Sequence, residues 1–393
     1  MSLAPKSLLC LSLISALTLA ISTPAKGANP DDGYPQGVSA PGRTCPNAPV
    51  GEVVVSEITQ KSLVCTLIDG QKKWWVKGEP LPAATGGSTD KAPEIVYIPK
   101  YKLPAKALAK MKVYENVTYA NKSATQHLDI YMPKGVSKPP LIVWTHGGGF
   151  VIGDDDFMKF DESAKLLELF IKNGIAVASV NYRLAQEALF PAAGVDTKSA
   201  IRFLRANASK YGYDPKKFAT GGDSAGSYLA LMAAITADQP SPFDDPTDPN
   251  RGVSAKVSAV IGLYGNVDFF EMTSNNEKYP CDQSKNPYPG APGNINPWFG
   301  DTRDAKVQAA MKSGGLYPYI KSSTSLPTFY IFHGSDDCSV SPYDSKNLDA
   351  AVKAQNGKST LKIVPGAIHG GAGVWDAAMK AVPAIKKTLI SAK

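Results

Sequence analysis

Short apolar runs alternate with longer amphipathic segments through the C-terminal three quarters of the chain. Residues 141–144 and 176–180 are almost continuously apolar, which is typical of strands buried on both faces of a parallel sheet. Between them, residues 160–173 have apolar positions at helical spacing, and Gly174 follows as a stop signal. Strands that alternate with helices predict right-handed βαβ units and therefore an α/β fold with a doubly wound, mostly parallel sheet.

The same alternation continues toward the C-terminus. We expect a helix over residues 193–211 and later strands near residues 218–220, 257–263, 328–332 and 361–364. Within residues 266–319, the stretch 279–299 is too rich in Pro, Asn and Gly for regular structure. Loops at the carboxyl edge of such a sheet commonly carry specificity, so this segment is the expected determinant of substrate choice.

A small β-rich module with its own cysteines is expected at residues 35–78. Its runs at 63–68 and 72–76 flank Asp69-Gly70, a hairpin signal. The tryptophans of the second run could stack on sugar rings and so contact a polysaccharide or the cell envelope. They could instead fill a tiny core, and this second interpretation is favoured because so small a domain needs large side chains.

Three further features complete the domain organisation. Lys6 precedes an apolar run at residues 8–21 and then small residues, which predicts a signal peptide over residues 1–27 and hence a secreted or envelope-associated protein. Residues 79–100 are rich in Pro, Gly, Ala and Ser/Thr and are expected to be a linker. The α/β catalytic domain is then assigned to residues 113–393.

Charge and cysteine content bear on the type of partner and on the disulfide bonds. The net charge of +7 comes mainly from lysine, and no nucleic-acid motif accompanies it, so a solvated basic surface is favoured over a nucleic-acid partner. Without the signal peptide the chain has four cysteines, an even number in an oxidising compartment. The simplest pairing is Cys45–Cys65 in the small module and Cys281–Cys338 in the large domain.

Gly222-Asp223-Ser224-Ala225-Gly226 is the strongest chemical signal in the chain. The pattern G-x-S-x-G is typical of a serine nucleophile on a sharp strand-to-helix turn, where small neighbours allow strand and helix to approach. Ser224 is therefore the candidate nucleophile.

The order of the residues along the chain selects the base. In this type of triad the acid and then the histidine follow the serine. Of the four histidines, only His369 lies after both the serine and the acid candidates. Asp336 and Asp337, which follow a late strand, could each orient that histidine.

An anion site and the absence of a metal complete this interpretation. Gly148 and Gly149 can offer bare backbone N–H groups to an oxyanion, and the N–H of Ala225 can supply another. The histidines and cysteines lack metal-ligand spacing, so no metal and no cofactor are expected.

Several motifs together resemble the hormone-sensitive-lipase-type branch of the α/β-hydrolases, and most of all its feruloyl-esterase-like (BD-FAE) group. These motifs are His146-Gly147-Gly148-Gly149-Phe150, Asn181-Tyr182-Arg183-Leu184, Phe190-Pro191-Ala192 and Tyr211-Gly212-Tyr213-Asp214-Pro215 before the elbow, together with His333-Gly334 and the glycine-rich loop around His369.

The resemblance implies particular roles and two departures. It implies Asp337 as the acid, Ser224 and His369 as nucleophile and base, and Gly148 and Gly149 as oxyanion donors. Ser227 stands where the family usually has a second glycine, and Ser341 intervenes before Pro342 in the acid loop. No catalytic atom is lost, so the departures bear on the substrate.

The leading hypothesis is a secreted serine esterase acting on small-molecule or glycan-linked esters, with feruloyl and acetyl groups as candidates. A serine peptidase-like amidase is the enzymatic alternative. From another class, the chain could be an inactive hydrolase fold used for binding, although it retains all the expected catalytic groups.

Overall fold

The computed structural model describes residues 53–55, 61–68, 71–77, 101–279, 281–282, 295–296 and 298–392. The predicted signal peptide and linker lie outside these residues, as does Cys45, so the expected Cys45–Cys65 pairing is not described.

The small sheet is antiparallel and consists of β1 (Val53–Val55), β2 (Ser62–Ile68) and β3 (Gln71–Val76). Strands β2 and β3 pair in antiparallel register, from Leu63 opposite Val76 to Ile68 opposite Gln71. Trp74 is buried with Leu63, Cys65 and Val76 in a small cluster. In this sheet Trp74 therefore serves as a core residue.

The large sheet has eight strands in the order β13-β12-β9-β8-β6-β7-β5-β4. They are β4 (Met111–Thr118), β5 (His127–Pro133), β6 (Leu141–Thr145), β7 (Ala176–Val180), β8 (Phe218–Asp223), β9 (Ala259–Leu263), β12 (Thr328–Gly334) and β13 (Ser359–Val364). Only β5 runs against the rest, because its pairings with β4 and β7 are antiparallel and the other pairings are parallel. This confirms the predicted doubly wound α/β fold.

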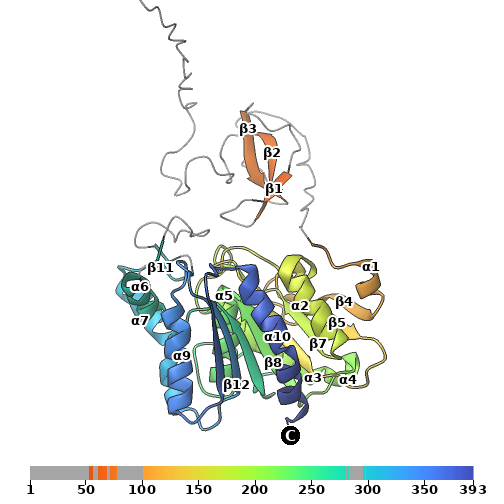
Figure 1. The fold of residues 1–393 in the computed structure, drawn as a ribbon. Coiled ribbons are helices and arrows are strands. Elements are labelled where there is room, and N and C mark those ends of the chain that lie inside the picture. Colours follow the sequence, from red (N-terminus) through yellow and green to blue (C-terminus); the bar gives the residue numbers. More distant parts are fainter. Residues whose placement is uncertain are drawn as a thin grey trace, which may run out of the picture.

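Helices cover both faces of the large sheet (Figure 1). They are α1 (Ala105–Leu108), η1 (Asp155–Lys159), α2 (Asp161–Lys172), α3 (Ala192–Ala206), α4 (Ala208–Tyr211), α5 (Ala225–Thr236), α6 (Phe269–Lys278), α7 (Ala305–Ser313), α8 (Tyr317–Ser322), α9 (Pro342–Ala354) and α10 (Ala372–Ile390). Helices α2 and α10 lie side by side on one face, while α3 and α5 pack on the other. In β6, Leu141 and Val143 face the layer of α3 and α5, whereas Ile142 and Trp144 face the layer of α2 and α10. Side chains that alternate between the two faces of a strand produce this pattern.

The structure departs locally from the sequence expectations at two places. The helix expected over 193–211 is interrupted at Asn207, whose side-chain Nδ2 donates to the carbonyl of Phe203 at 2.8 Å; this side-chain bond competes with the helical ladder. The stretch 279–299 also contains a two-residue strand, β10 (Ile295–Asn296), paired with β11 (Gly300–Asp301). Among the described helices, none is both long and apolar enough to cross a membrane.

Candidate active site

Ser224 occupies the turn between β8 and α5 in a strained backbone conformation. Its φ is 50° and its ψ is −121°, a region that non-glycine residues rarely adopt. Its N–H donates to the carbonyl of Leu263 at 2.9 Å, which fixes the turn to the end of β9. The surrounding structure holds this strained backbone conformation. The conformation places the Ser224 side chain at the carboxyl edge of the sheet.

The glycines that flank Ser224 are required by close packing. A Cβ on Gly226 would lie within 3.0 Å of the carbonyl oxygens of Thr145 and His146, and one on Gly222 would meet the carbonyl of Gly226. The hydroxyl of Thr145 donates to that same Gly226 carbonyl at 2.7 Å. The elbow is therefore clamped against the end of β6, where the glycine-rich loop begins.

His369 and Asp337 lie next to Ser224 in one line of hydrogen bonds. The Nε2 of His369 is 2.9 Å from Ser224 Oγ, and its Nδ1 is 2.8 Å from Asp337 Oδ2. Because Nδ1 carries a proton toward the carboxylate, Nε2 is left as the acceptor for the serine hydroxyl. The structure thus brings together the three residues that the sequence selected.

Asp337 is fully buried yet well supplied with donors. Its Oδ1 accepts from the N–H groups of Ser339 and Val340, each at 2.9 Å. Burial raises the pKa of this carboxyl, but the charge of His369 and hydrogen bonds from His333 and His369 outweigh it and hold the pKa well below its usual range. The group is consequently an anion at neutral pH.

Asp336, the other acid candidate, has a structural role. Its N–H donates to the carbonyl of Ala367 at 2.9 Å, and its Oδ1 accepts from Ser335 Oγ at 2.7 Å. These contacts hold the acid loop against the loop that precedes His369.

His333 is a second histidine partner of Asp337 that the sequence did not identify. Its Nε2 lies 2.9 Å from the carbonyl of Val340 and 3.2 Å from Asp337 Oδ2, and its Nδ1 lies 2.7 Å from Ser345 Oγ. Since a carbonyl only accepts, Nε2 is the protonated nitrogen. Chain order excluded His333 as the base, and the only sequence signal for it is its place in the His333-Gly334 pair just before the acid loop.

The glycine-rich loop at residues 146–149 lies against the elbow with free donors. Within the described part of the chain, no acceptor is bonded to the N–H groups of Gly148, Gly149 or Ala225. Gly148 and Gly149 have φ values of 107° and 60°, a region that suits glycine. The loop and the elbow thus offer three backbone donors for a negatively charged oxygen.

Two buried titratable groups support this loop. Burial lowers the pKa of His146 to about 4, and its neutral ring stacks on Tyr182 at 4.3 Å between centroids. Burial also raises the pKa of Asp223 to about 7. Both side chains are buried beside the loop.

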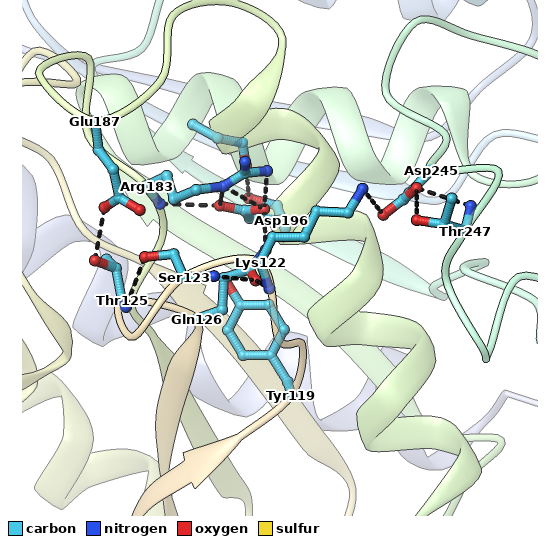
Figure 2. A network of polar contacts seen from close by, with 12 residues as sticks. Tyr119, Lys122, Ser123, Thr125, Gln126, Arg183, Glu187, Asp196, Asp245 and Thr247 are labelled. Atoms are coloured by element: carbon cyan, nitrogen blue, oxygen red, sulfur yellow. Dashed lines mark hydrogen bonds and ion pairs between the residues drawn. The ribbon is translucent and has the colours of Figure 1, made fainter.

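A polar network anchors the segment that carries Tyr182 (Figure 2). Arg183 donates to the carboxylate of Asp196 through its backbone N–H at 2.9 Å, Nε at 2.9 Å and NH2 at 2.7 Å, and Gln126 Nε2 is a fourth donor at 2.7 Å. The Asp196 side chain is completely buried. Tyr119 donates to the carbonyl of Asn181 at 2.8 Å, so the β4–β5 turn and the segment after β7 are held together.

Replacing Arg183 by alanine is expected to lower the free energy of unfolding by about 3–5 kcal/mol, because it leaves the Asp196 carboxylate buried without its cation. Urea unfolding followed by circular dichroism measures the change. Lys122→Ala is the matched control in the same network: Lys122 pairs with Asp245 but is 41% exposed, so the loss should stay within about 1 kcal/mol. Equal losses in the two variants would contradict the argument.

Both departures from the family pattern are accommodated locally. The side chain of Ser227 fits against Gly262 and Gly265, where a Cβ on either glycine would meet it. Ser341 begins α9 as its N-cap, with its Oγ accepting from the Tyr343 N–H at 3.2 Å and Pro342 in the first turn. Neither change disturbs the positions of the catalytic candidates.

Cys281 and Cys338 form a disulfide with a Cα–Cα distance of 5.6 Å, as the sequence predicted. The bridge joins the segment after α6 to the residue next to Asp337. Asn276, near the end of α6, strengthens this connection through its Oδ1, which accepts from the Ser341 N–H at 2.8 Å, and its Nδ2, which donates to the carbonyl of Ser339 at 3.2 Å.

The double variant Cys281→Ser/Cys338→Ser is expected to lose about 2–4 kcal/mol of unfolding free energy, because the unfolded chain is no longer cross-linked. We also expect a lower turnover number, since Asn276 is then left as the connection between α6 and the acid loop. Thermal unfolding and steady-state kinetics measure the two effects. The unsubstituted protein treated with dithiothreitol should change in the same direction, and unaltered melting temperature and turnover in both samples would refute the anchoring role.

Aromatic side chains connect the glycine-rich loop to the segment expected to select the substrate. Phe150 stacks on Trp298 with centroids 4.1 Å apart and an interplanar angle of 10°. Trp298 also contacts Phe269 and Tyr228 edge-on or tilted, and it is fully buried.

Within the described residues, no group of three or more His, Cys, Asp or Glu could hold a metal ion.

Comparison with known proteins finds a matching family model and relatives that are esterases. The family model BD-FAE matches residues 128–352, more than half of the chain. The esterase LipC of Mycobacterium tuberculosis is 28% identical over 251 residues, which cover 62% of this chain and 57% of LipC. The carboxylesterase NlhH of the same species is 32% identical over 143 residues, or 36% of this chain and 44% of NlhH. This chain spans about half the length of the curated relatives it matches.

Solved structures give the same fold. A truncated carbohydrate esterase from gut microbiota has a TM-score of 0.55 and 25% sequence identity, covering 70% of this chain and 96% of that chain. A bacterial heroin esterase has a TM-score of 0.54 and 22% identity, covering 71% of this chain and 84% of that chain.

Proposed function

The chain belongs to the BD-FAE family of α/β-hydrolases, and from this premise we propose that it is a serine esterase that hydrolyses carboxylic esters through an acyl-serine intermediate. The observation that carries the proposal is the unbroken line from Ser224 Oγ through His369 to Asp337, with links of 2.9 and 2.8 Å. A structural serine would not need a strained φ of 50° or a histidine so placed.

In the first half of the reaction, Ser224 Oγ attacks the ester carbonyl carbon while its proton passes to His369 Nε2. The carbonyl oxygen becomes an oxyanion and is stabilised by the N–H groups of Gly148, Gly149 and Ala225. The Asp337 carboxylate stabilises the imidazolium. The intermediate then breaks its bond to the alcohol oxygen, which takes the proton from His369 and leaves.

In the second half, water attacks the acyl carbon and gives its proton to His369 Nε2. The bond to Ser224 Oγ breaks, the serine recovers its proton from His369, and the free acid is released. No group beyond these residues and water is needed to balance either step.

A fluorophosphonate probe tests the proposal directly. We expect one adduct on Ser224 in the folded protein, together with turnover of p-nitrophenyl acetate. The inactive binding protein predicts no adduct and no turnover. An amidase predicts that p-nitroanilide substrates are cleaved at rates comparable with the esters, so both substrate types are compared in one assay.

We further propose that the esters are carried by carbohydrates, as feruloyl or acetyl groups, and that the protein is exported. The likeness to a carbohydrate esterase structure at 25% identity supports the first point, and the apolar run at residues 8–21 supports the second. Turnover of p-nitrophenyl esters with no release from feruloylated or acetylated glycans would overturn the carbohydrate assignment. Retention of the full-length chain inside the producing cell would overturn the export.

A further inference from the structure

A basic hollow of about 860 Å³ lies on the surface of the large domain. Six lysines contribute to its lining, and no Asp, Glu, Arg or aromatic residue does. These lysines are Lys110, Lys134, Lys138, Lys172, Lys217 and Lys386.

The hollow lies at the amino edge of the large sheet. Pro140, Gly174 and Lys217 line it, and they stand directly before β6, β7 and β8 or within one residue of them. Ser224 follows the other end of β8. Strands of five or six residues at about 3.3 Å per residue place the two edges roughly 15–20 Å apart. A partner bound in the hollow therefore leaves the catalytic edge open.

The lysine charges of the hollow are only partly neutralised. Lys172 pairs with Glu168 at 3.0 Å and Lys217 with Asp214 at 3.2 Å. Lys134 Nζ donates to the uncharged carbonyl of Ala109.

The remaining three lysines, Lys110, Lys138 and Lys386, have no carboxylate within ion-pair distance in the part of the chain that the structure describes. The hollow therefore has an excess of positive charge, which favours an anionic partner.

Two aliphatic side chains on the lining point to the class of anion. Val136 is 40% exposed and Ile390 is 52% exposed. Ile390 lies in the last turn of α10, near the chain end marked C in Figure 1. A polyanion in water offers these side chains no apolar partner, whereas a lipid interface buries them beside the acyl chains. The lining also lacks the aromatic side chains on which nucleic-acid bases stack.

We propose that this hollow, formed by the six lysines with Val136 and Ile390, binds the surface of an anionic phospholipid membrane. The lysines attract the lipid headgroups, and the two aliphatic side chains enter the interface. This inference does not depend on the esterase activity: it assigns the amino edge of the sheet to anchoring and leaves the carboxyl edge for substrate.

Sedimentation with vesicles of phosphatidylcholine containing phosphatidylglycerol tests the proposal on the full chain. The variant Lys110→Gln/Lys138→Gln/Lys386→Gln is expected to bind about 100-fold more weakly, which corresponds to about 3 kcal/mol for three lysines near a charged surface. The matched control, Lys306→Gln/Lys312→Gln/Lys321→Gln, removes the same charge from exposed positions on α7 and α8 and should bind as the unsubstituted protein does.

A second variant separates a membrane from a soluble polyanion. Val136→Ser/Ile390→Ser should weaken vesicle binding several-fold while leaving the melting temperature and the hydrolysis of p-nitrophenyl acetate unchanged. Equal binding to neutral and anionic vesicles, or an equal loss in both lysine variants, would overturn the proposal. So would binding to polygalacturonate that exceeds vesicle binding and ignores the Val136 and Ile390 substitutions.

Discussion

Ser224→Ala is expected to lower the turnover number for ester hydrolysis by a factor on the order of 10⁴–10⁶, because no other group can form the acyl intermediate. His369 then has no hydroxyl to deprotonate, and only the N–H groups of Gly148, Gly149 and Ala225 remain to stabilise charge. Steady-state hydrolysis of p-nitrophenyl acetate measures the loss, and labelling by the fluorophosphonate probe should disappear with it.

Ser224→Gly provides the matched comparison. It is equally unable to act as a nucleophile, but glycine adopts a φ of 50° without the strain that alanine retains, so it should be more stable than Ser224→Ala by about 1 kcal/mol. Equal inactivity with this difference in stability is the expected pattern. An alanine variant with a tenth of the original turnover would show that Ser224 is not the nucleophile.

Asp337→Asn is expected to lower the turnover number by roughly 10⁴-fold at neutral pH. The carboxylate accepts from Ser339, Val340, His333 and His369 at once. An amide of the same shape has only one accepting atom, so its NH₂ group must face donors and His369 takes the wrong tautomer. Steady-state kinetics across pH 5–9 measures the effect.

Asp336→Asn is the control for this prediction, because the half-buried side chain of Asp336 accepts from its neighbour Ser335 and lies outside the hydrogen-bonded line of catalytic candidates. We expect less than a few-fold change in turnover. Equal losses of turnover in Asp337→Asn and Asp336→Asn would contradict the assignment of Asp337 as the acid.

The Asp337 variant should also alter the pH dependence of stability. Because the pKa of Asp337 is depressed in the folded protein, its ionised form contributes stability that is present above the unfolded pKa of about 3.9 and is lost as the pH falls through the folded value. The stability difference between the variant and the unsubstituted protein should therefore be largest at neutral pH and shrink under strongly acidic conditions. Urea midpoints measured from pH 7 to pH 2.5 test the sign.

The sequence determined the fold class through local signals that the tertiary structure did not override. The buried runs that form β6 and β7 are apolar along their length, so their strand character follows from burial on both faces. The small residues on either side of Ser224 likewise reflect backbone contacts with Thr145 and His146. Chain order and histidine scarcity then identified His369.

The arrangement of neighbours, in contrast, was decided only by folding. His333 and Asp337 are four residues apart, and nothing local indicates that the ring turns back to the carboxylate. Arg183 and Asp196 meet in a buried pair because the segment after β7 folds back against α3. The basic hollow likewise gathers six lysines from segments far apart along the chain.

The physical reason is the separation in sequence of the residues that make contact. Strand and helix patterns, turns and the elbow arise from contacts between residues close in sequence, and one sequence therefore predicts them. Pairs such as His369 with Ser224, separated by 145 positions, depend on which strands become neighbours in the sheet. The sequence thus determined which residues could do the chemistry, and the packing of β8, β12 and β13 decided that they meet.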